Sequence, residues 1–178
     1  MELVAIYNEA RTTQNTHRRG EPLPQGWYMV IAAVWVVNKR GELLLTLRSP
    51  EKKEYPNTWE NPGGAVLAGE TSKQGMVREL REETGITAEE SQLEFLVSRR
   101  TESSFVDTYL LFWQGEEVTL QPGETAAAKW VTLKQLEQAA RAGELAKPIA
   151  KDFALALPKL KQRLASITGA ESLQKSTQ

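Results

Sequence analysis

A cluster of glutamates in segment 64–86 constrains this chain more than any other feature of its sequence. The segment starts at a Gly-Gly turn and continues, after a short loop, as a helix predicted from about Thr71 to Thr84. Glu79, Glu82 and Glu83 stand at positions i, i+3 and i+4, so their carboxylates lie on one side of that helix. Like charges at this spacing repel each other, at about 0.2–0.5 kcal/mol per pair. The pattern therefore indicates a bound cation.

The residue types around this cluster favour a hard cation. The chain has no cysteine and one histidine, His17, which lies in a predicted loop and is either solvated or a contact for metal or phosphate. Carboxylate oxygens without histidine or cysteine suit Mg²⁺, with Mn²⁺ as a substitute. Because Mg²⁺ usually completes its shell with water and substrate phosphates, we expect a phosphate or diphosphate substrate. A backbone carbonyl at the Gly63-Gly64 turn could join the ligands, since glycine lets the backbone approach closely.

The rest of the chain mixes strand and helix patterns. Met29–Val37 and Glu42–Arg48 are nearly continuously apolar around a turn, which predicts a hairpin of central strands covered on both faces. Strands and helices follow without strict alternation, which predicts an α/β (α+β) fold with a mixed central sheet between helices. The other expected strands are Leu3–Tyr7, Leu93–Thr101, Val106–Trp113, Val118–Leu120 and Lys129–Thr132, the expected helices are Leu133–Ala142 and Ile149–Ile167, and the expected loops are Arg11–Pro24 and Ser49–Pro62.

The length and net charge of the chain limit the number of domains and the kinds of partner that we expect. With 178 residues, we expect one domain over 1–168, with 1–28 as an N-terminal extension that contains an edge strand, and a frayed polar tail over 169–178. The net charge of -1 gives no global field for nucleic acid, so neither nucleic acid nor a membrane is an expected partner. The longest apolar run has nine residues, too few to span a bilayer, which favours a soluble cytoplasmic protein.

Segment 64–86 also resembles a known family pattern, the Nudix box Gx5Ex7REUxEExGU, in which U is apolar. The matching residues are Gly64, Glu70, Arg78, Glu79, Leu80, Glu82, Glu83, Gly85 and Ile86. The resemblance implies a Nudix-type α/β/α sandwich and a metal-dependent hydrolase that cleaves a nucleoside diphosphate linked to another moiety, X. It implies metal ligation by the three glutamates and by a carbonyl of Gly63 or Gly64. It also implies that Arg78, paired with Glu70, anchors the loop to the helix rather than forming a plain surface ion pair.

Candidate residues outside the box extend this site. Glu124 precedes Trp130 in a segment that resembles one of the family, so it is a candidate metal ligand or base, with an ordinary loop residue as the alternative. The fallback candidates are Glu116 and Glu117. Three residues upstream of the box are candidates for the substrate: Arg48 and Lys53 for phosphate oxygens, and Trp59 for stacking on a base, against plain solvation or core packing.

The segments before the box resemble one branch of the family, that of isopentenyl diphosphate isomerase. The resemblance lies in GEPLPQGWY, LTLRSPEKK and YPNTWENPGG. That isomerase chemistry needs a cysteine, which this chain lacks, so isomerase activity is not expected. A second alternative is a catalytically silent Nudix domain that binds ligands, although such domains usually carry a broken box. The identity of the diphosphate substrate stays open, and the N-terminal segment and the C-terminal helix are candidate surfaces for a homodimer.

Overall fold

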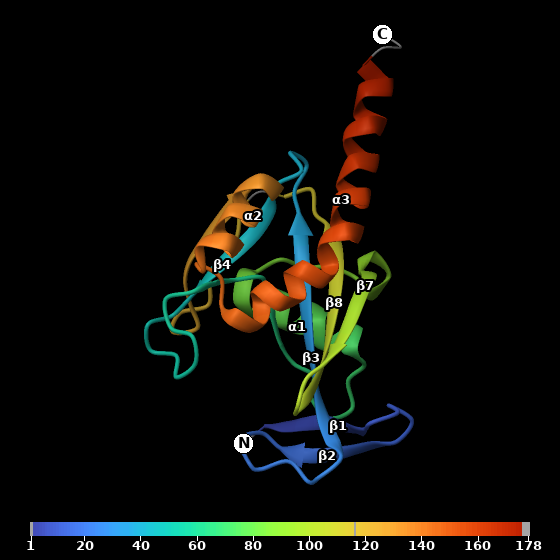
Figure 1. Cartoon of the computed structure of the whole chain (residues 1–178), viewed down its shortest axis with the longest axis vertical. Helices are drawn as coiled ribbons and strands as arrows, with labels where there is room; N and C mark the ends of the chain where they lie inside the picture. Colours follow the sequence, from blue (N-terminus) through green and yellow to red (C-terminus); the bar gives the residue numbers. More distant parts are fainter. Residues whose placement is uncertain (1, 116, 176–178) are drawn as a thin grey trace.

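Strand β3 (Trp27–Val37) is the longest strand and organises the sheet (Figure 1). The computed structural model describes residues 2–115 and 117–175, with side chains up to Ser166. One edge of β3 pairs in parallel with β8 (Ser104–Phe112) from Met29 to Val37. The other edge is shared by three antiparallel strands: β1 (Leu3–Asn8), β6 (Gly63–Ala65) and β4 (Leu43–Arg48).

This shared edge corrects the predicted hairpin. The strand β4 exists, but its register with β3 contains only Val37 opposite Leu43. Farther along this edge, the N–H of Val34 donates to the carbonyl of Pro62 and Ile31–Ala33 pair with β6, so β4 has separated from β3 there. Instead β4 pairs with β5 (Trp59–Glu60) and with β9 (Thr125–Val131).

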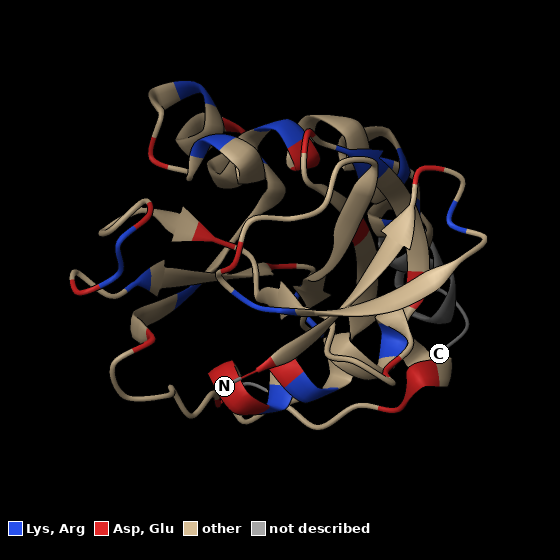
Figure 2. Cartoon of the chain, turned by 90° about the horizontal axis from the view of Figure 1, so that it is seen from below, with Lys and Arg blue, Asp and Glu red and all other residues tan. Residues whose placement is uncertain are grey.

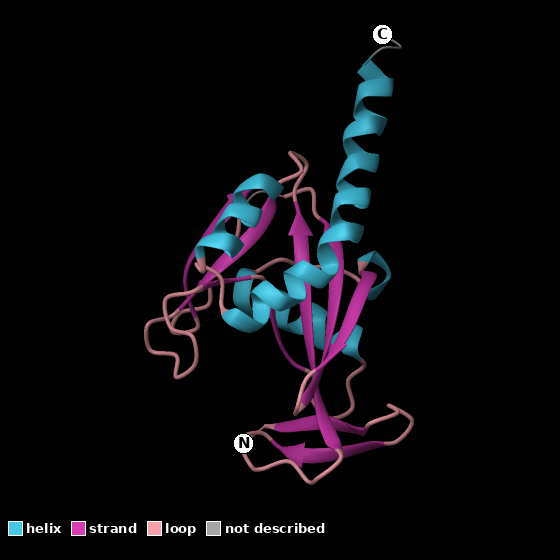
Figure 3. Cartoon of the chain, viewed as in Figure 1, coloured by secondary structure: helices cyan, strands magenta, loops and turns pink. Residues whose placement is uncertain are grey.

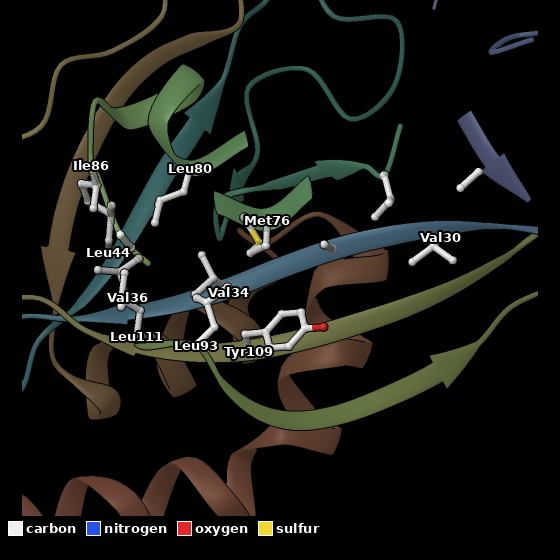
Figure 4. Close-up of a cluster of buried hydrophobic side chains, with 14 residues drawn as sticks. Val30, Val34, Val36, Leu44, Met76, Leu80, Ile86, Leu93, Tyr109 and Leu111 are labelled. Carbon is white, nitrogen blue, oxygen red and sulfur yellow. The ribbon is translucent and has the colours of Figure 1, made fainter. Parts of the chain in front are cut away.

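Helices cover the sheet on both faces. Even-numbered residues of β3, such as Val34 and Val36, pack with Met76 and Leu80 of α1 (Ser72–Thr84) in one buried cluster (Figure 4). Odd-numbered residues such as Trp35 face α2 (Leu133–Ala142) and α3 (Lys147–Lys175) in a second cluster. Burial on both faces explains why the strand is almost continuously apolar. The expected mixed sheet between helices is confirmed.

The remaining elements lie at the margins of this sandwich (Figure 3). Strand β7 (Glu94–Arg100) pairs with β8, and a short 3-10 turn, η1 (Glu90–Gln92), precedes it. The predicted strand Val118–Leu120 is wrong, because those residues form no ladder. Helix α3 continues past Ile167 to Lys175, through most of the expected tail, in a sequence rich in good helix formers. Residues 176–178 lie outside the described part.

The N-terminal extension forms a hairpin across one end of β3. Strand β2 (Gln14–Arg18) pairs with β1 inside the segment predicted as a loop, so that prediction is wrong, and β2 rather than β1 is the edge strand. The strand escaped prediction because its side chains are polar and mostly exposed, and backbone pairing alone forms it. Charged residues of both signs are spread over the fold (Figure 2). Within the described residues, no helix is long and apolar enough to cross a bilayer.

Candidate active site

Helix α1 is delimited by its own end signals. Thr71 is the N-cap, and its side chain and that of Gln74 form a reciprocal capping box. Gly85 ends the helix in the left-handed conformation at φ 70°. Buried Met76 and Leu80 orient the helix on the sheet, so the glutamates come to lie along its margin near the Gly-Gly turn. The predicted helix and both of its ends are confirmed.

Arg78 ties the helix to the loop before it. Its Nε and Nη2 donate to the two carboxylate oxygens of Glu70 at 2.7 and 3.0 Å, and Nη2 also donates to the carbonyl of Ala65 at 2.9 Å. Its Nη1 donates to Glu79 at 2.8 Å and to Glu82 at 3.2 Å. The hydrogen bonds to Glu70 are the main reason why the pKa of Arg78 is raised. This geometry is that of the anchor implied by the family resemblance.

Glu83 is the most deeply buried carboxylate of the cluster. It accepts one hydrogen bond, from the backbone N–H of Gly63 at 3.1 Å. Burial, with Glu60, Glu79 and Glu124 nearby, raises its pKa to about 8. Burial also raises the pKa of Glu79, against the opposing effect of Arg78. The cluster therefore holds carboxylates whose negative charge is poorly compensated by the protein alone.

The two glycines make the close packing around this cluster sterically feasible. A Cβ atom at Gly64 would collide with the carboxylate of Glu79, and one at Gly63 would lie 2.6 Å from the carbonyl oxygen of Ala32. Any side chain at either position would push the turn away from the sheet or displace the carboxylate. The backbone of the turn thus lies directly against the glutamate side of α1.

Glu60 is a site residue that the sequence reasoning missed. It lies on β5, and Arg48 Nη1 donates to both of its carboxylate oxygens at 3.0 Å. Burial raises the pKa of Glu60, although Arg48 opposes the rise, and Glu60 in turn raises the pKa of Glu83. Glu60 falls in the segment predicted as a loop, 49–62, so that prediction is wrong at β5, and only the pairing of β5 with β4 brings Glu60 to Arg48.

Glu124 lies near the cluster, as expected, but in an ion pair. Lys52 Nζ donates to its carboxylate, and its backbone carbonyl accepts the N–H of Ser49 at 3.0 Å. Of the two fallback residues, Glu116 lies outside the described residues, and Glu117 is exposed and does not line the cavity described next.

A cavity of about 200 Å³ brings together the glutamates of α1, Arg78 and Glu124. It adjoins a larger cavity of about 460 Å³, and Glu60 lines only this larger one. The two cavities share four lining residues: Arg19, Arg48, Gly63 and Gly64. The larger cavity runs over the odd-numbered residues of β3 toward the start of α3. The lining of the smaller cavity, which we call the acidic cavity, is Glu2, Arg19, Arg48, Lys52, Gly63, Gly64, Arg78, Glu79, Glu82, Glu83, Gln121 and Glu124.

Two of the predicted substrate residues are not brought to these cavities. Lys53 is exposed and lines neither of them. Trp59 packs at the margin of the α2–α3 cluster, and Lys129 Nζ lies 3.8 Å from the centre of its ring. The ring position is thus explained by packing and a cation–π contact. Arg48 alone of the three lines both cavities.

The candidate ligand atoms are of the chemical type that binds a hard divalent cation. Carboxylates and the glycine carbonyls supply only oxygen, as Mg²⁺ prefers, and buried Glu83 lacks a cationic partner among its hydrogen bonds. In the described part of the chain, no three acidic or histidine side chains are close enough to hold an ion as they stand. Arg78 holds Glu79 and Glu82, and Lys52 holds Glu124. Side-chain rotation away from these partners would be needed to complete a site.

Comparison with known proteins agrees with this geometry. The chain is 36% identical over 148 residues to the uncharacterized Nudix hydrolase lin0387 of Listeria innocua, covering 81% of this chain and 88% of the relative. It is 34% identical over 111 residues to the CTP pyrophosphohydrolase of Escherichia coli, covering 61% and 78%. The crystal structure of DR0079 from Deinococcus radiodurans superposes with a TM-score of 0.68 at 28% identity, covering 82% and 92%. The NUDIX domain model matches residues 27–153, and the chain is therefore a member of the Nudix hydrolase family.

Proposed function

We propose that this Nudix hydrolase uses Mg²⁺, with Mn²⁺ as a substitute, to cleave the diphosphate linkage of a nucleoside diphosphate joined to another group. The observation that supports this proposal best is Glu83, a buried carboxylate with three more carboxylates nearby and a single backbone hydrogen bond. A buried anion of this kind is stabilised by a cation. The residues that would hold it are Glu79, Glu82, Glu83 and Glu124, with a carbonyl of Gly63 or Gly64.

The protein groups have distinct tasks in the proposed reaction. A divalent cation at such a site supplies charge neutralisation on the diphosphate and a lower pKa for water. One carboxylate of the set takes the proton of the attacking water, whose oxygen bonds to phosphorus while the bond to the leaving phosphate breaks. Arg48 faces both cavities and can pair with phosphate oxygens. Arg78 acts by holding the loop and helix together.

The two adjoining cavities support a division of the substrate between them. The acidic cavity, with its mixed charges, suits the diphosphate and the cation. The larger cavity is lined by apolar strand residues such as Ile31 and by polar groups such as Ser104, which suits an organic group such as a nucleoside. Binding by Lys53 and stacking by Trp59 stay predictions, as do a cytoplasmic location and a homodimer.

The test is a substrate panel measured with Mg²⁺ and again with EDTA. The panel contains nucleoside triphosphates first, because one relative is named a CTP pyrophosphohydrolase, then nucleotide sugars and dinucleoside polyphosphates. We expect metal-dependent release of phosphate products from at least one class. Glu83→Gln keeps the shape of the side chain and should lower kcat at least about a hundredfold, the range of general acid–base and metal-site losses.

A matched control separates this effect from a general loss of charge. Glu144 is an exposed glutamate that lines neither of the two cavities, so Glu144→Gln should keep full activity. Near-normal turnover by Glu83→Gln on the best substrate would contradict the proposal that the glutamates of α1 bind the metal and carry the catalysis. A panel without turnover, together with tight binding of a nucleotide, would instead favour a ligand-binding module.

A further inference from the structure

The N-terminal hairpin brings a basic side chain to the site from outside the family domain. Arg19 directly follows β2, and it lines both the acidic cavity and the larger cavity. The NUDIX domain model matches residues 27–153, so the whole hairpin precedes the matched part. Figure 1 shows the hairpin lying across the end of β3, where that strand begins.

The hairpin is firmly docked on the loop that leads into α1. The N–H of Ala5 donates to the carbonyl of Val66 at 3.0 Å, and the N–H of Ala68 donates to the carbonyl of Leu3 at 2.9 Å. Val4 and Ile6 are buried in a small cluster of their own. Because β1 is fixed to this loop, the residues paired with β1 are held at a constant position relative to the glutamates of α1.

A second attachment fixes the far end of the hairpin. Arg11, in the turn between β1 and β2, donates through two nitrogens to both oxygens of buried Asp107 on β8, each at 2.8 Å. Two separate contacts therefore hold the hairpin, one on the α1 loop and one on the sheet. Such a rigid support is what a substrate-binding side chain requires.

Arg19 differs from the other basic residues of the acidic cavity in its exposure. The side chains of Arg48, Lys52 and Arg78 are 21%, 27% and 19% exposed, and their partners Glu60, Glu124 and Glu70 are also mostly shielded or close to the cluster. The side chain of Arg19 is 53% exposed, and its partner is Glu2, at 2.6 Å, which is 54% exposed.

An ion pair this exposed contributes little to stability, but it can orient the guanidinium. Arg19 is also close enough to Glu79 to counteract part of the rise in the pKa of that carboxyl. The guanidinium of Arg19 therefore lies at the junction of the two cavities, with donors available to a new anion.

We propose that Arg19, oriented by Glu2, binds phosphate oxygens of the substrate where the acidic cavity meets the larger one. Arg19 thereby makes the N-terminal hairpin part of the substrate site. The inference rests on the proposed function, since it names a further binding residue for the same diphosphate.

The adjacent arginine provides a matched control. Arg18 is 59% exposed, its ion-pair partner Glu21 lies 3.8 Å away, and it lines neither cavity. Each variant, Arg19→Ala and Arg18→Ala, removes one exposed arginine from the same hairpin. The two variants therefore remove the same charge, and both ion pairs are exposed enough to contribute little to stability.

The experiment measures binding of inorganic imidodiphosphate, a diphosphate that resists hydrolysis, by calorimetry in the presence of Mg²⁺. Loss of an exposed charge-assisted hydrogen bond should raise Kd about five- to tenfold for Arg19→Ala, whereas Arg18→Ala should stay within about twofold of the wild type. Arg19→Lys keeps the charge and should recover part of the loss. Equal values for the two alanine variants, or no binding by the wild-type chain, would overturn the inference.

Kinetics on the best substrate of the panel separate this inference from the proposed function. Arg19→Ala should raise KM by a similar factor and change kcat less, because Arg19 binds substrate without touching the attacking water. Wild-type turnover with unchanged KM in Arg19→Ala would overturn the role of Arg19 and leave the proposed function standing. Failure of the whole panel would instead count against the proposed function.

Discussion

Two carboxylates of this protein are largely removed from solvent but have opposite surroundings. Asp107, on β8, accepts two hydrogen bonds from Arg11 at 2.8 Å each and one from the hydroxyl of Ser98 at 2.7 Å. Glu83, on α1, accepts one from the N–H of Gly63 at 3.1 Å and has other carboxylates nearby. Asp107 thus accepts three hydrogen bonds from side chains, two of them from a cation, whereas Glu83 accepts one from the backbone.

The difference appears in their pKa values. Burial alone would raise the pKa of Asp107, but the hydrogen bonds from Arg11 and Ser98 outweigh it and the pKa falls below the ordinary 3.8. For Glu83, burial and the neighbouring carboxylates prevail, and the pKa rises to about 8. Asp107 therefore stabilises the fold as an ion, whereas the ionised form of Glu83 costs folding free energy. Charges that a fold tolerates at a cost are typical of functional sites.

The largest effect should come from breaking the Arg11–Asp107 pair. Arg11→Met leaves the carboxylate of Asp107, 4% exposed, without its cation, and should lower the free energy of unfolding by about 3–5 kcal/mol. Urea denaturation followed by tryptophan fluorescence measures the loss. The double variant Arg11→Met/Asp107→Asn removes the stranded charge and should recover much of the stability.

An exposed ion pair that joins the same hairpin to the end of β7 is the control. Arg100 pairs with Glu9, and their side chains are 47% and 67% exposed. Arg100→Met should leave the urea midpoint nearly unchanged, because solvent screens such pairs. If Arg11→Met behaved like Arg100→Met, the pair with Asp107 would not be the anchor that we infer.

A smaller effect of opposite sign is expected at Glu83. In EDTA, Glu83→Gln should raise Tm at pH 8.5, by at least about 3 °C, since roughly 2–4 °C correspond to 1 kcal/mol in a chain of this size. The folded pKa, about 8, exceeds the ordinary 4.5, so this group loses stabilisation as pH rises from about 4.5 to 8. The advantage of the glutamine variant should therefore shrink toward pH 5, as thermal unfolding across this range will show.

Metal sharpens the same comparison. Mg²⁺ at pH 8.5 should raise the Tm of the wild type more than that of Glu83→Gln, because an ion that binds only the folded state stabilises it by mass action. Equal shifts in the two proteins would mean that Glu83 does not contribute to metal binding.

These predictions also show where sequence reasoning succeeds. The ends of α1 follow from Thr71 and Gly85, which act within a few residues of the helix. The spacing of Glu79, Glu82 and Glu83 is likewise a local property, so both the helix and its cluster could be read directly from the chain. The mixed sheet between helices followed from apolar patterns of the same short range.

The errors arise where distant segments meet. Arg11 stands in a segment predicted as a loop and Asp107 in a predicted strand, and nothing local links two residues 96 positions apart. In the same way, Glu60 belongs to the site because β5 pairs with β4, which brings it to Arg48. The partial hairpin of β3 and β4 has this origin too, since β4 pairs along its length with β9 and β6 pairs with β3 farther along the same edge. Such pairings depend on the whole topology.

The smallest expected effect is the loss of stability when Asp107 is protonated at acid pH. Its pH dependence is opposite in sign to that of Glu83, whose ionisation lowers stability as pH rises. The folded pKa of Asp107 lies below the ordinary 3.8, so its contribution to stability is present above that pH and is lost as pH falls through the folded pKa. One such group changes the free energy of unfolding by at most about 1.4 kcal/mol per pH unit. Urea midpoints between pH 5 and 2.5 should fall more steeply for the wild type than for Arg11→Met/Asp107→Asn, in which the group is absent. Parallel slopes would mean that Asp107 is not held as an ion by Arg11, and the contrast with Glu83 would lose its physical basis.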